Sequence, residues 1–215
     1  MEVVSEDNLG DRVLVTVLAS LSRRGFRAGP GPNPGPETRI RPLGEGVESW
    51  VGLNRRSRAG QPVILHPMVG VRHAAVEAEV VRLAEDPPAA TYAPTVFAPL
   101  DHWSRRYGDL EVAALGSRAQ RQLDKMAEAI DQACVDVGAR AASLPGLLDS
   151  LDDPTLCLSG LAPPRRAVVL RLLGRLDEAL ATMDAAVAEL GPRHDPAAER
   201  TRLFARRFRC EAVGT

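Results

Sequence analysis

Apolar residues near the start of the chain recur at the spacing of one helix face. These residues are Leu9, Val13, Leu14, Val17, Leu18 and Leu21. The polar run at positions 5–8 can cap free backbone N–H groups, and Gly25 is a residue type that commonly ends a helix. The pattern predicts an amphipathic helix that ends at about Arg24.

Two strand-like runs follow, separated by an arginine-rich turn at positions 54–60. In the first run, residues 47–54, Val51 and its alternate neighbours share one face and Trp50 lies on the other. The second run covers residues 63–71 and is almost continuously apolar. Because sequential strands with short connections usually pair directly, the runs predict an antiparallel meander.

Weaker signals surround this pair of strands. Thr38–Leu43 predicts a short edge strand, since Pro42 would interrupt a central ladder. A helix that covers the sheet is expected at His73–Ala84. Residues 95–100 predict a further strand, and residues 110–115 fit either a strand or a helical turn.

Residues 29–36 consist almost entirely of glycine and proline. Proline lacks the N–H donor of a ladder and glycine is entropically costly to order, so the segment predicts an exposed loop. The alternative is a proline-rich ligand for a partner domain. Such ligands use PxxP spacing, whereas the prolines here occupy every second position.

From Ser117 onward the pattern is helical throughout. One apolar stripe consists of Leu123, Met126, Ala127, Ile130, Ala133, Cys134 and Val137. Shorter helices are expected at Leu144–Leu151 and Pro196–Val213. Between them, Arg165–Leu190 predicts two helical segments joined near Gly174.

These patterns predict the α+β fold class. An antiparallel meander of three to five strands, packed by an N-terminal helix and a crossing helix, is expected in residues 1–115. A helical region is expected in residues 116–215, and the two regions are expected to pack as one continuous globular unit.

Composition limits the classes of partner. Aromatic residues are only 4% of the chain, so its core must consist mainly of Leu, Val and Ala. The net charge of −1 provides no global field for nucleic acid or acidic membrane. The arginine-rich composition, with Lys125 the single lysine, is typical of GC-rich bacterial coding sequences.

The location is predicted from what the sequence lacks. The acidic N-terminal residues do not resemble a secretion signal, and no apolar run reaches the roughly 18 residues that span a membrane. The three cysteines include no CxxC pair, so they favour free thiols in a reducing compartment over a zinc site. A cytoplasmic protein is expected.

Motifs for catalysis, metal binding and phosphate binding are missing. The four histidines form no HxH, HxxxH or HExxH pair, and neither GxSxG nor GxxxxGK[ST] occurs. No catalytic residue, metal or cofactor is therefore predicted. The alternative is an enzyme or small-ligand-binding protein, with a pocket between sheet and helices lined by His66, His102 and Asp101.

Two clusters are candidate contact surfaces for a partner protein. The first is the arginine-rich turn with an aromatic neighbour: Trp50, Arg55, Arg56 and Arg58, to which Arg39 and Arg41 would add charge. The second consists of His102, Trp103, Arg105, Arg106 and Tyr107. Aromatic and arginine side chains are enriched at interfaces, although a solvated hairpin tip is the simpler interpretation of the first cluster.

Two resemblances add to this interpretation. The run 172–180, Leu-Leu-Gly-Arg-Leu-Asp-Glu-Ala-Leu, resembles the interior of one tetratricopeptide repeat. A single repeat implies an αα-hairpin rather than a peptide-binding array, because stacking normally requires about three repeats.

The wider layout, from Arg24-Gly25-Phe26 through the meander to the C-terminal hairpin, resembles a group of uncharacterised bacterial α+β domains that includes candidate toxin-immunity proteins. The resemblance implies a non-catalytic cytoplasmic protein that binds another protein, in an immunity-like or accessory role. Nucleic-acid binding through the arginine-rich turn and last helix is disfavoured by the balanced net charge. The sequence predicts no oligomeric state.

Overall fold

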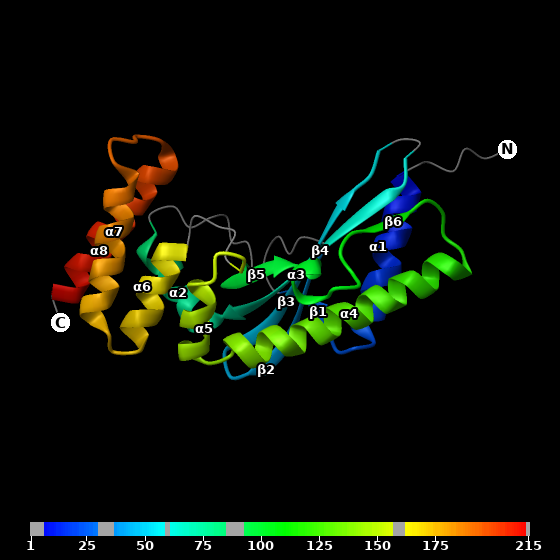
Figure 1. Cartoon of the computed structure of the whole chain (residues 1–215), viewed down its shortest axis with the longest axis horizontal. Helices are drawn as coiled ribbons and strands as arrows, with labels where there is room; N and C mark the ends of the chain where they lie inside the picture. Colours follow the sequence, from blue (N-terminus) through cyan, green and yellow to red (C-terminus); the bar gives the residue numbers. More distant parts are fainter. Residues whose placement is uncertain (1–6, 30–36, 59–60, 85–92, 157–161, 214–215) are drawn as a thin grey trace.

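The computed structural model describes residues 7–29, 37–58, 61–84, 93–156 and 162–213 (Figure 1). In chain order the elements are α1 (Asp7–Ser22), β1 (Arg27–Ala28), β2 (Thr38–Gly44), β3 (Val47–Arg56), β4 (Val63–His73), α2 (Ala74–Leu83), β5 (Val96–Pro99), α3 (Leu100–Trp103), β6 (Leu110–Val112), α4 (Ser117–Ala141), α5 (Leu144–Leu151), α6 (Ala162–Leu172), α7 (Leu176–Leu190) and α8 (Pro196–Val213).

The strands form one antiparallel sheet in the order β1-β2-β3-β4-β5. β5 and β6 both pair with the same edge of β4. β6 pairs with residues 63–65 at its N-terminal end, and β5 pairs with residues 68–71 farther along. The predicted α+β class and antiparallel meander are confirmed. The predicted edge strand β2 lies one position inside the edge, because the two-residue β1 pairs with it and is too short to leave a sequence pattern. Residues 110–112 are a strand, which resolves the alternative of a helical turn.

α1 ends as its sequence predicts. Gly25 adopts a φ of 83°, and the Phe26 amide then donates to the Leu21 carbonyl oxygen at 3.2 Å. This reverse turn returns the chain to the sheet and places the Phe26 ring in the core. Most of the predicted loop at 29–36 lies outside the described residues.

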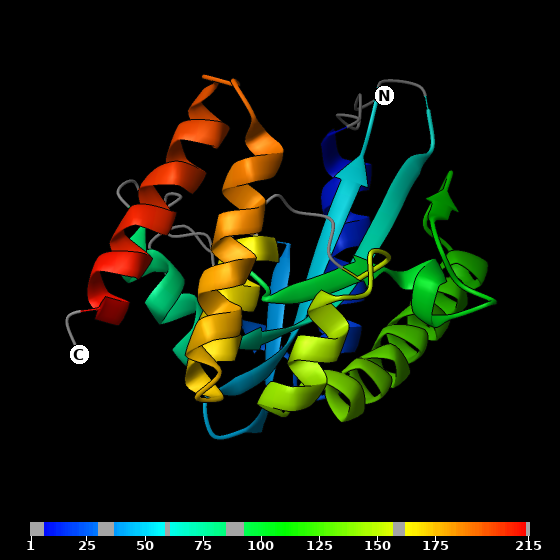
Figure 2. The same cartoon turned by 60° about the vertical axis from the view of Figure 1, so that its left-hand side comes forward.

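The helices form two groups around the sheet. α1 and α4 cover one face of it (Figures 1 and 2). The second group forms the other end of the molecule and consists of α2, α5, α6, α7 and α8. α6 and α7 make a hairpin through Gly174, whose φ is 75°, and α8 packs beside α7. The hairpin and its turn therefore lie where the sequence predicts them.

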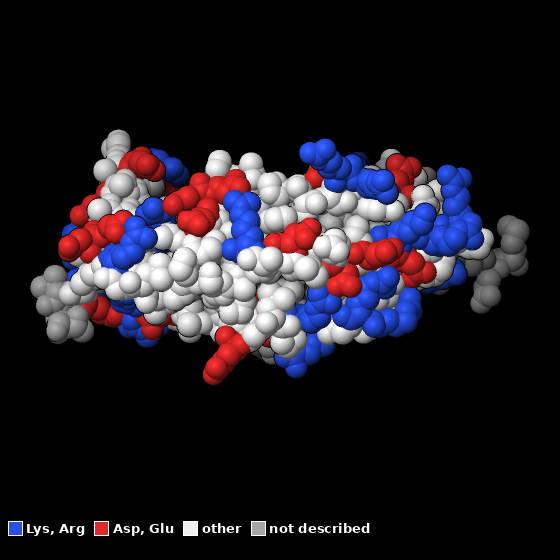
Figure 3. Space-filling model, turned by 60° about the horizontal axis from the view of Figure 1, so that its bottom comes forward, with Lys and Arg blue, Asp and Glu red and all other residues white. Residues whose placement is uncertain are grey.

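Charged side chains cover much of the outer surface. Figure 3 shows arginine and lysine interspersed with aspartate and glutamate over the half that carries α1 and α4, and an uncharged area toward the other half. This mixing agrees with the nearly equal totals of 27 basic and 28 acidic residues. Among the described helices, none combines the length and hydrophobicity needed to cross a lipid bilayer.

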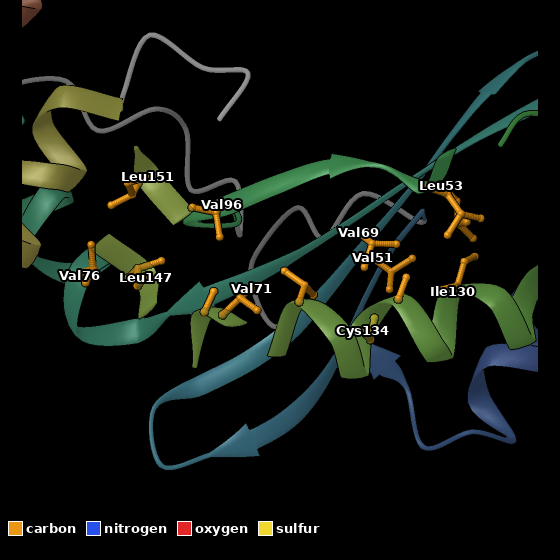
Figure 4. Packing of buried hydrophobic residues seen from close by; sticks show 14 of the residues in the cluster. Val51, Leu53, Val69, Val71, Val76, Val96, Ile130, Cys134, Leu147 and Leu151 are labelled. Carbon is orange, nitrogen blue, oxygen red and sulfur yellow. The ribbon is translucent and has the colours of Figure 1, made fainter. Parts of the chain in front are cut away.

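Most of the buried apolar residues form one hydrophobic cluster that includes side chains from α1 through to α8. Val51 and Val69 of the sheet point toward Ile130 and Cys134 of α4 (Figure 4). The complete stripe predicted for α4 is buried. Periodicity of two along the strands and 3.6 along the helix thus accounts for the main contact between the layers.

Candidate functional site

Trp50 lies on the sheet face opposite α1 and α4, because it alternates with the buried Val51. Its ring centroid is 6.0 Å from that of Phe97 on β5. The ring also covers Gly52, where an added Cβ would lie 2.4 Å from a ring carbon. Trp50 is half-buried and packed on its own sheet.

The arginines of the first predicted cluster do not stay together. Arg55 Nη1 donates to Asp11 Oδ1 at 2.6 Å, which connects the β3–β4 hairpin to α1. Arg41 Nη1 donates to Asp131 Oδ1 of α4, also at 2.6 Å. Arg56 and Arg58 remain exposed. Two of the five predicted arginines, Arg41 and Arg55, are therefore used to join elements of the fold.

The second predicted cluster lies on α3 and the loop after it. Trp103 is half-buried against the core, and the exposed His102 ring lies edge-on to it with centroids 4.8 Å apart. The Trp103 Nε1 atom is buried and has no hydrogen-bond partner among the described residues. Arg105 and Arg106 are exposed and Tyr107 is half-buried.

Three of these residues line a hollow of about 540 Å³ against α4, which we call the α3–α4 hollow. Trp103, Arg106 and Tyr107 form one wall. The side chains of the α4 wall include Lys125, Glu128, Ala129, Asp131, Gln132, Val135 and Asp136. His102 and Arg105 do not belong to the lining, so only part of the predicted cluster converges.

The rim of the α3–α4 hollow is charged and its wall carries an exposed apolar group. Val135 belongs to the lining and is 53% exposed. Asp131 is paired with Arg41, whereas the described part of the chain provides no ion pair for Arg106, Lys125 or Glu128. These three charges are available to a partner.

The histidines considered for a pocket have separate partners. His66 Nδ1 lies 2.7 Å from Asp109 Oδ1, whereas His102 contacts Trp103. His73 is buried with Nε2 2.8 Å from the Ala141 carbonyl oxygen, and burial lowers its pKa, opposed by that carbonyl and by Glu77. Within the described ranges, no three His, Cys, Asp or Glu side chains are placed to hold a metal.

Cys134 is buried in the core and Asp195 lies at the start of a helix. Burial raises the pKa of the Cys134 thiol to about 12, so it is not a nucleophilic thiolate at neutral pH. Cys157 lies outside the described residues. Asp195 caps α8, since its Oδ1 accepts from the backbone amides of Ala197 and Ala198.

Sequence patterns alone did not single out the α4 wall. Lys125, Glu128 and Asp136 lie on the predicted polar side of a helix, where charges are ordinary. The available signal was Val135, an apolar residue outside the predicted buried stripe. Comparison of the chain with protein-family models, curated proteins and solved structures gave no match.

Proposed function

We propose that this chain is a non-catalytic cytoplasmic protein that binds another protein through the α3–α4 hollow. The observation that carries the proposal is the convergence of half-buried Trp103 and Tyr107 with the exposed Val135 inside a charged rim. Aromatic anchors surrounded by polar side chains are the arrangement enriched at the centre of protein interfaces.

The lining favours a protein over a small molecule. Five of the twelve described lining residues are charged, two of them basic and three acidic. A small ion of one sign would be attracted by one set and repelled by the other, whereas a protein partner can present charges of both signs. A partner surface can place its own charges against Arg106, Lys125 and Glu128 and its apolar side chains against Val135.

The geometry also favours this surface over the one around Trp50. There the aromatic ring packs on Phe97, and Arg55 is bound by Asp11. At the α3–α4 hollow the Trp103 N–H lacks an acceptor among the described residues. An unsatisfied buried donor costs about 1–3 kcal/mol, and an acceptor from a partner would remove that penalty once neighbouring side chains move.

The immunity-like resemblance supplies the class of partner in this proposal. The chain would bind a toxin protein and block it, without catalysing a reaction. The α6–α7 hairpin, which resembles one tetratricopeptide repeat, would act as an accessory packing unit, because a single repeat offers little concave surface.

The test uses a photo-crosslinking amino acid at Val135 in the full-length protein, expressed in its native host. Val81, which is 45% exposed on α2, is the matched control position. A crosslinked protein obtained from position 135 and not from position 81 supports the proposal. Equal crosslinking from both positions, or none from either, contradicts it.

The captured partner then allows a quantitative test. Val135→Arg is expected to weaken its Kd at least about tenfold, which corresponds to about 1.4 kcal/mol. Val81→Arg should leave the Kd unchanged. Both positions are exposed, so neither substitution opens a core cavity, and circular dichroism checks that each variant folds.

A further inference from the structure

α8 lies at the opposite end of the molecule from α1 (Figure 1). It carries a basic hollow of about 550 Å³. Three arginines line it, namely Arg200, Arg202 and Arg206. His194 adds an imidazole from the loop before the helix. The proposed protein-binding function does not use this hollow.

The wall of this α8 hollow is held in place by hydrogen bonds. Arg202 donates from Nη1 to the Arg193 carbonyl oxygen at 2.6 Å and from Nη2 to the Gly191 carbonyl oxygen at 2.7 Å. Arg193 Nε donates to Asp195 Oδ2 at 2.9 Å, and Asp195 caps α8. The loop is thus fixed beside the helix, with His194 within it.

The charges of the α8 hollow are not neutralised internally. Arg209 of the same helix pairs with Asp184, and Arg207 donates to the Leu83 carbonyl oxygen. By contrast, Arg200 and Arg206 are exposed, and the described residues offer neither of them an ion pair. Glu199 is the one acid among the described lining residues, so the hollow has a local surplus of two positive charges.

We propose that the α8 hollow binds a phosphate monoester carried by a small organic molecule. Guanidinium groups donate in a fork that matches phosphate oxygens, and the dianion matches the surplus of two positive charges. Leu203 and Pro196 provide apolar surface for the organic part. The volume lies within the range of small-molecule sites.

The experiment is a calorimetric titration of the full-length protein with phenyl phosphate at constant ionic strength. Phenyl sulfate, a monoanion of similar shape, and benzoate, a carboxylate, are the comparison ligands. Saturable binding of phenyl phosphate at least about tenfold tighter than either comparison ligand supports the site. Equal binding of phenyl sulfate or benzoate overturns the assignment to phosphate monoesters, and no saturable binding overturns the site.

The matched variants remove the same charge from two places. Arg200→Ala/Arg206→Ala is expected to weaken phenyl phosphate binding at least about tenfold. Arg118→Ala/Arg121→Ala, two exposed arginines on α4, should leave it unchanged. Equal weakening by both pairs would assign the effect to net charge and overturn the proposal. The result is independent of binding at the α3–α4 hollow, because the probe and the variants do not involve that surface.

Discussion

The ion pair between Glu77 of α2 and Arg165 of α6 provides a sharp test of how the helical end is attached. The two side chains come from positions 88 residues apart and are 7% and 2% exposed. Arg165 Nε donates to one carboxylate oxygen at 2.9 Å and Nη2 to the other at 3.1 Å. The perturbation is Arg165→Met, which removes the charge and keeps much of the side-chain volume.

The expected loss is large because the carboxylate stays buried without its counterion. Charges about 4 Å apart attract by about 4 kcal/mol at an effective dielectric constant near 20. Measured losses for breaking one partner of a buried pair are similar, about 3–5 kcal/mol. We therefore expect Arg165→Met to lower the free energy of unfolding by this amount.

The double variant Glu77→Leu/Arg165→Met tests the physical reason for the loss. Replacing a buried pair by apolar side chains is often neutral or stabilising, because neither charge then has to be desolvated. We expect the double variant to be within about 1 kcal/mol of the wild type or more stable. Urea unfolding followed by circular dichroism measures all three free energies, with m-values compared to check for two-state behaviour.

An exposed pair in the same helical end is the control. Arg175 Nη2 lies 2.6 Å from Glu178 Oε2 with both side chains largely in water. Arg175→Met should leave the free energy of unfolding essentially unchanged, because solvent screens such pairs. The reasoning is refuted if Arg165→Met costs less than about 1 kcal/mol, or if the double variant is no more stable than that single variant.

Three further outcomes are expected. Gly70→Ala should lower the free energy of unfolding by about 1–3 kcal/mol in urea melts, because an added Cβ would lie 2.2 Å from a β5 carbonyl oxygen. Gly44→Ala is the control and should change the free energy little, because an added Cβ there would have no atom within 4 Å. Equal losses for the two variants would contradict the explanation by this close contact. Iodoacetamide at mildly alkaline pH should label the exposed Cys210 and spare Cys134 until the protein is unfolded, as read by peptide mapping, because burial raises the pKa of Cys134 to about 12. Burial lowers the pKa of His73, so the imidazole takes up a proton at higher pH in the unfolded chain than in the folded one. The free energy of unfolding should therefore fall as the pH drops below the ordinary His pKa of 6.5. His73→Gln should flatten that part of the pH profile measured by urea unfolding, and an unchanged profile would refute the assignment to His73.

Local periodicity was sufficient to predict most elements. The stripe that includes Leu123 and Ile130 repeats every three or four residues, and each of its members is buried in α4. Gly25 and Gly174 were expected to end or join helices, and both adopt the left-handed backbone region that favours glycine. β1 was missed because two residues cannot display a period, and pairing with β2 alone defines it.

The candidate site was less accessible to sequence reasoning. Both aromatic–arginine clusters had the composition of an interface, and nothing local distinguished them. Trp50 meets Phe97 only because β3 and β5 flank β4 in the sheet, and Arg55 meets Asp11 only because α1 packs across the hairpin. The hollow beside Trp103 likewise required α4 to lie against the loop after α3.

The amino-acid pattern alone determined the main apolar stripes that face the interior, such as that of α4, since helix and strand periods depend only on neighbours along the chain. Tertiary packing decided which charges are neutralised. Arg41 reaches Asp131 across 90 positions, and Arg165 reaches Glu77 across 88, while Arg106 and Arg206 have no ion pair among the described residues. An arginine on a polar face looks the same in sequence in all four cases, because its partner depends on which distant helix or strand the core brings beside it.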